Sequence, residues 1–96
     1  MEENPVLLLK DTLDGLGGSE LIVFQYYLQQ PGLGFNPLKK AHLEGASSMD
    51  TAVKMVEAYT VEVVNIAVRI LRMMLKNHLA DQLARKGMHL SHKQGF

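Results

Sequence analysis

The stretch from Val63 to Met74 constrains the fold more than any other part of the chain. Apolar side chains recur in it every three or four residues, a spacing that places them on one face of an α-helix. These apolar residues are Val63, Ile66, Ala67, Ile70, Leu71 and Met74. Because a helix with such a broad apolar stripe must be covered by other elements, we expect it to lie at the centre of a helical core.

Two further helices are predicted in the first third of the chain. One runs from about Pro5 to the pair Gly17-Gly18, because proline suits a helix start and glycine a helix end. The other begins at Ser19, which can cap it, and ends at Pro31. The residues expected to face the core are Leu9, Leu13 and Leu16 in the first helix and Leu21, Phe24 and Leu28 in the second.

Between the second helix and about Ser48 we predict a long connection. Proline and glycine interrupt any helical period in this segment. They are Pro31, Gly32, Gly34, Pro37 and Gly45. At most one short helix is expected there, at residues 38–43. A loop of this length in a small domain often has a function of its own.

Two more helices are expected, one on each side of the central one. The earlier helix is capped by Ser48 or Asp50 and ends near Thr60. The later helix is capped by Asn77 and closes at Gly87. Their core-facing residues would be Ala52, Met55, Val56 and Tyr59 in the earlier helix and Leu79 and Leu83 in the later one. We therefore expect one domain over residues 1–87, with 88–96 as a flexible tail or the start of a linker.

The composition excludes several classes of function. Ten lysines and arginines balance ten aspartates and glutamates, so the basic excess typical of nucleic-acid or membrane-surface binding is missing. No segment approaches the roughly 20 apolar residues of a membrane span. The chain has no cysteine, which rules out disulfides and thiolate zinc sites and agrees with a reducing compartment, so we expect a cytoplasmic protein.

No residue pattern predicts catalysis or a bound cofactor. The glycines at 15–18 are not followed by the lysine and hydroxyl residue of a phosphate-binding loop, and no serine, histidine and aspartate order has supporting context. His89 and His92 form an H-x-x-H pair without further ligands, which does not predict a metal site. We expect no enzyme activity, no cofactor and no metal.

Several motifs taken together resemble the pyrin domain of the death-fold superfamily over roughly residues 5–86. The core residues from Leu13 to Leu28 are spaced like that family's L-x-x-L-x-x-x-x-L-x-x-F-x-x-x-L signature. The runs at 70–74 and 77–83 are similar to its I-L-R-x-M and N-x-L-A-x-x-L elements. The resemblance implies an all-α fold, a six-helix antiparallel bundle of death-fold type. In it, a long connection between helices 2 and 4 would carry at most a short third helix.

The resemblance also implies a function. Pyrin domains are homotypic protein–protein interaction modules that nucleate or join inflammasome-type signalling assemblies in innate immunity, the inflammatory response and apoptosis. The implied partners are other pyrin domains, in an adaptor, in a receptor or in a second copy of this chain. In that family an acidic face on helices 1 and 4 meets a basic face on helices 2 and 3. On this chain the acidic face would carry Asp11, Asp14 and Asp50, and the basic face would carry Lys39 and Lys40.

The second helix departs from that family's pattern. Positions that commonly carry lysine in the family hold Ile22, Val23 and Tyr27 here. Together with Tyr26, these residues cannot all face inward if the core residues of this helix do, so they predict either an exposed interaction patch or a surface covered by the long loop. The departure favours an alternative function, an inhibitory or capping module that binds a pyrin partner without forming filaments. A helical DNA-binding domain is disfavoured by the zero net charge.

Overall fold

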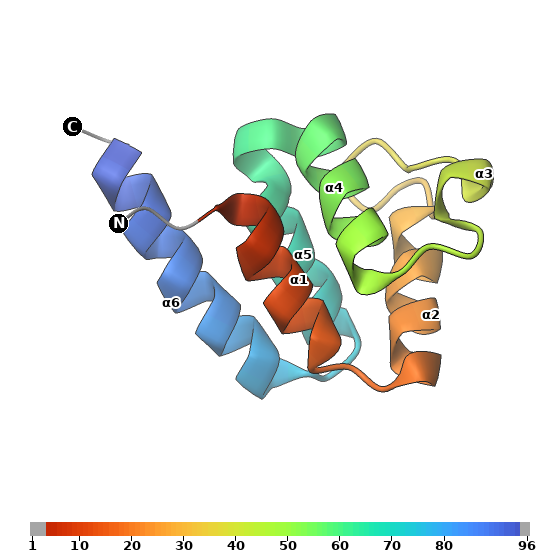
Figure 1. Ribbon diagram of the computed structural model, residues 1–96, viewed down its shortest axis with the longest axis horizontal. Coiled ribbons are helices and arrows are strands. Elements are labelled where there is room, and N and C mark those ends of the chain that lie inside the picture. The colour runs from red at the N-terminus through yellow and green to blue at the C-terminus, as the bar shows by residue number, and fades with distance from the viewer. Residues whose placement is uncertain (1–3, 95–96) are drawn as a thin grey trace.

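The chain folds into helices around one apolar core, and the loops between them are short except for the one after the second helix. The computed structural model describes residues 4–94, with side chains up to Gly87, and this part of the chain contains no strand. The helices are α1 (Pro5–Asp14), α2 (Gly18–Leu28), α3 (Lys40–Leu43), α4 (Ser48–Tyr59), the 3-10 helix η1 (Thr60–Glu62), α5 (Val63–Met73) and α6 (Asn77–Gln94). The all-α class, the long connection after α2 and the short third helix are confirmed (Figure 1).

Helix α5 lies at the centre of the core, as its sequence predicts. It packs against α2, α4 and α6, while α1 packs against α4 and α6 on the near side in Figure 1. Ile70 and Leu71 are fully buried, and Phe24, Leu9 and Leu13 meet them from other helices. Fully burying one such side chain stabilises a protein by about 1.5–3 kcal/mol, so this cluster dominates the stability of the fold.

Three helices begin earlier than predicted, and one of them is α6, which begins at the expected cap Asn77 itself, so that cap is wrong. Helix α4 is capped by Ser47, whose hydroxyl accepts a hydrogen bond from the Asp50 backbone amide at 3.1 Å, so the expected caps Ser48 and Asp50 are wrong. The Asp50 carboxylate instead accepts from the Ser47 amide at 3.3 Å, which completes a capping box. Helix α2 is capped at Gly17, so the predicted cap Ser19 is also wrong, and the Glu20 carboxylate accepts the Gly17 amide at 3.1 Å.

The last helix does not stop at Gly87. Helix α6 continues to Gln94, so the predicted stop is wrong, while the domain boundary drawn there stays a prediction. Gly87 is buried, and a Cβ atom at this position would overlap the Cγ1 methyl of Val64 on α5. The glycine therefore permits a close approach of two helices, which is a different use from the termination of a helix.

The long connection is held against α4 and α5. The Tyr59 hydroxyl donates a hydrogen bond to the Asn36 carbonyl at 2.7 Å, and the Phe35 ring meets the Tyr59 ring edge-on at 5.7 Å between centroids. Arg69 on α5 donates from Nη1 to the Leu33 carbonyl at 2.8 Å. These anchors hold the loop on the side of α4 and α5, so the outward surface of α2 stays uncovered.

Replacing Gly87 with alanine tests the close contact between α5 and α6. Valine is short and stiff, so Val64 cannot yield easily, and overpacking costs about 1–3 kcal/mol against a gain of up to about 1 kcal/mol in helix propensity. We expect Gly87→Ala to lower the free energy of unfolding by about 1–2 kcal/mol in urea titrations. Gly18→Ala, where a Cβ would meet nothing within 4 Å, is the control and should not lower it. An unchanged midpoint for Gly87→Ala would contradict this contact.

The anchor at Tyr59 predicts a pH dependence at alkaline pH. Burial raises the pKa of Tyr59 to about 12, while a phenol in the unfolded chain titrates near pH 10. The contribution is therefore constant below about pH 10, and the free energy of unfolding falls as the pH rises from about 10 to about 12. In chemical denaturation across this range, Tyr59→Phe should be less stable at neutral pH but should lose this part of the slope. An identical slope in both proteins would refute the assignment.

Candidate interaction surfaces

The first candidate surface, which we call the α1–α4 face, is acidic. It lies along α1 and α4, which run side by side in Figure 1. Asp11 and Asp14 are exposed on the outward side of α1, and Asp50 is exposed in the first turn of α4. Hydrogen bonds from Lys10, at 2.7 Å, and then from Ser48 hold the pKa of Asp14 below its usual value. The structure therefore brings Asp14 to the start of α4.

Apolar side chains are interspersed among these acids. Leu7 is 50% exposed and shares the outward side of α1 with Asp11 and Asp14. Met49, next to Asp50, is also exposed. Neither residue was predicted from the sequence, although the i, i+4, i+7 spacing from Leu7 to the two aspartates places Leu7 opposite the buried side of the helix.

The second candidate surface, which we call the α2–α3 face, is apolar with a basic edge. Ile22 is 65% exposed and Val23 is 43% exposed. Tyr26 is 59% exposed, whereas Tyr27 is half-buried and packs on the core, so the exposed ring lies one residue before the one selected from the sequence. The surface of this helix is therefore exposed and not covered by the long loop, while its role as an interaction patch stays a prediction.

The apolar residues of α2 meet α3 at a hollow. Ile22 and Tyr26 line it together with Lys40 and Gly45, and its volume is about 380 Å³. At its base, the Gln25 side chain donates to the Thr51 hydroxyl at 2.9 Å and to the Ala46 carbonyl at 3.0 Å. Because Gln25 and Thr51 are both buried, this pair fixes α2 against the start of α4. Gln25 is a single polar residue within the apolar run of α2, and this was the one sign in the sequence that could have predicted the contact.

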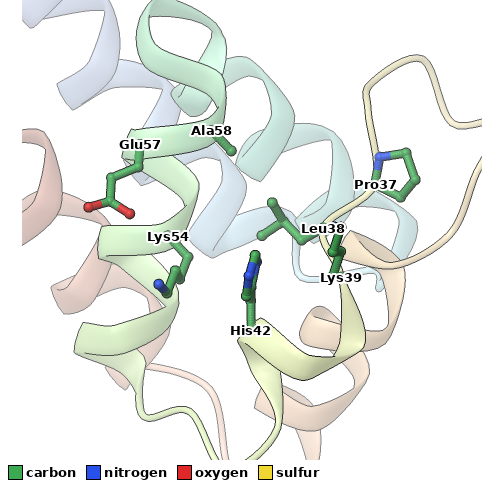
Figure 2. Close-up of a pocket in the computed structure, with 7 residues that line it drawn as sticks. All are labelled: Pro37, Leu38, Lys39, His42, Lys54, Glu57 and Ala58. Atoms are coloured by element: carbon green, nitrogen blue, oxygen red, sulfur yellow. The ribbon is translucent and has the colours of Figure 1, made fainter.

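Lys39 does not line that hollow. It belongs to a cleft of about 320 Å³ between α3 and α4, which we call the α3–α4 cleft. Figure 2 shows His42 rising from α3 into this space, opposite Lys54 and Glu57 on α4. The two lysines selected from the sequence therefore lie on opposite sides of α3.

Among residues 4–87, whose side chains the structure describes, no three histidine, cysteine, aspartate or glutamate side chains are grouped so that they could hold a metal ion. The expected absence of a metal stays a prediction, since the side chains of His89 and His92 lie outside the described ones. Among the helices described, none has both the length and the apolar character that a membrane crossing requires.

Comparison with known proteins identifies the family. No curated protein matches the chain. The model of the PAAD/DAPIN/Pyrin domain family matches residues 8–81, which covers helices α2 to α5 in full and most of α1. Members of this family are protein-interaction modules that bind other death-fold domains. The chain belongs to the pyrin domain family.

Proposed function

We propose that this pyrin domain joins inflammasome-type signalling assemblies in the cytosol by binding a second pyrin domain. The α1–α4 face of one domain would meet the α2–α3 face of the other. The observation that carries this proposal is the difference in chemistry between the two faces. Exposed apolar residues lie among acids on the first face, whereas on the second they lie beside Lys40, with Glu44 also lining the hollow.

The apolar residues would supply most of the binding energy. Aromatic side chains at the centre of an interface dominate affinity, so Tyr26 with Ile22 is the expected anchor. Charges at the edge of an interface mainly steer and orient the partner. In this arrangement Asp11 and Asp14 of one domain approach Lys40 of the next. Leu7, on the same side of α1, adds an apolar contact between the two domains.

A second candidate function is an inhibitory or capping module that binds a pyrin partner without extending an assembly. It is supported by the composition of α2, because Ile22, Val23 and Tyr27 occupy positions that commonly carry lysine in the family. With the basic face reduced to Lys39 and Lys40, the charge attraction between identical copies is weaker. A partner with its own basic face could still bind the acidic α1–α4 face.

Charge reversal tests the two faces. We expect Asp14→Lys and Lys40→Glu each to weaken binding to an immobilised pyrin domain of an inflammasome adaptor or of this chain. The loss should be about fivefold, the upper range for an exposed ion pair. Glu62→Lys on η1 makes the same charge change as Asp14→Lys, is the control for that variant and should bind normally. Surface plasmon resonance measures the affinities and circular dichroism checks the fold. Two unchanged affinities would show that the faces are wrongly placed.

Light scattering with rising protein concentration separates the two candidate functions. Growth into ordered filaments at near-neutral pH and moderate salt is expected for an assembling domain, and electron microscopy identifies the filaments. A double change of Ile22→Ser and Tyr26→Ser should abolish the growth, since it removes the apolar anchor. The control Val61→Ser changes a residue that is 79% exposed on η1 and should leave growth intact. A monomer that persists at all concentrations supports the capping module instead.

A further inference from the structure

The α3–α4 cleft is built by three separate parts of the chain. The end of the long connection forms one wall, α3 forms the floor in the view of Figure 2, and α4 forms the opposite wall. The lining residues are Pro37, Leu38, Lys39, His42, Lys54, Glu57 and Ala58. Its volume of about 320 Å³ is at the lower end for ligand pockets and suits one or two side chains better than a whole domain.

The charges in this cleft are unbalanced. Lys39, Lys54 and His42 line it together with a single carboxylate, that of Glu57. The ion pairs found among the described residues all lie elsewhere, between Lys10 and Asp14, Arg72 and Asp81, and Lys76 and Glu20. Lys54 is half-buried, and none of these ion pairs includes it. An anion placed in the cleft would offset the excess of positive charge there.

The uncharged part of the lining narrows the chemistry of the ligand. Pro37, Leu38 and Ala58 give the cleft an apolar wall beside its cations. A free inorganic anion would leave that wall unused. An acidic residue next to an apolar one in a polypeptide would use both, since its carboxylate meets the cations and its neighbour covers the apolar wall.

We propose that the α3–α4 cleft binds an acidic peptide segment of a partner protein. The carboxylate lies between Lys54 and His42, with Lys39 at the edge, and the apolar neighbour packs on Leu38 and Ala58. This site is different from the hollow on the α2–α3 face and does not depend on the pairing of pyrin domains. A peptide probe therefore tests it without testing that pairing.

The experiment titrates the isotopically labelled domain with a blocked tetrapeptide of alternating leucine and glutamate, at a concentration where light scattering shows a monomer. Amide shifts are expected at His42, Lys54 and their neighbours. Lys54→Gln should weaken the affinity about two- to fivefold, as for the loss of one exposed ion pair, and Glu57→Gln should tighten it by a similar factor. Lys86→Gln, the same charge change on α6, is the control and should leave the affinity unchanged.

Three results would overturn the proposal. The first is equal weakening by Lys54→Gln and Lys86→Gln, because net charge alone would then explain the binding. The second is an equal response to a tetrapeptide in which glutamine replaces glutamate. The third is the same pattern of shifts with inorganic phosphate at a lower concentration than the peptide, which would assign the cleft to a free anion.

Discussion

Burial of α5 is the constraint on which the other features depend. Its apolar stripe runs the length of the helix, from Val63 to Leu71, and α2, α4 and α6 have to cover it. Covering it places α2 on one side of the core and α6 on the other. The surface residues follow from this arrangement, because the side of each helix that does not face α5 or its neighbours is left to solvent. The acidic and apolar faces are therefore positioned by the core rather than by contacts among themselves.

Polar contacts then fix the details that apolar packing leaves open. Gln25 and Thr51 join α2 to the beginning of α4, and Tyr59 with Arg69 hold the long connection in place. Apolar burial is not directional, whereas a hydrogen bond specifies one arrangement. This holds most strongly for the buried pair of Gln25 and Thr51, because leaving a buried polar group unpaired costs about 1–3 kcal/mol. The exposed patch on α2 depends on Tyr59 and Arg69, because these residues keep the loop on the side of α4 and α5.

Periodicity predicted much of this fold, and the errors have physical causes. The longer helices and their core-facing residues follow from apolar spacing, which tertiary packing reinforces, and the short third helix lies in the segment where proline and glycine left room for at most one. The prediction of the residue that caps α4 was wrong because Ser47, Ser48 and Asp50 are all good capping residues. Only the backbone geometry selects among them. The helix end predicted at Gly87 was wrong because a glycine that ends a helix and one that admits a neighbouring helix look the same in a sequence.

The backbone conformation of Leu75, which follows α5, could not be predicted. Its φ is positive, at 63°, where glycine or asparagine is usual. The predicted site residues are found mostly on the surface, but Tyr26 and Tyr27 could not be told apart, because which side of α2 its neighbours cover is a property of the whole molecule.

The two faces are different surfaces, and this difference has a consequence for geometry. A contact between unlike surfaces is heterologous, so it does not close into a two-fold pair but leaves one unlike surface free at each end. A row of domains joined in this way has a direction, with an acidic terminus and an apolar one. A molecule with one altered face would still attach at one terminus and would block further addition there. The difference between a subunit that extends such a row and one that stops it can therefore lie in a few residues of α2.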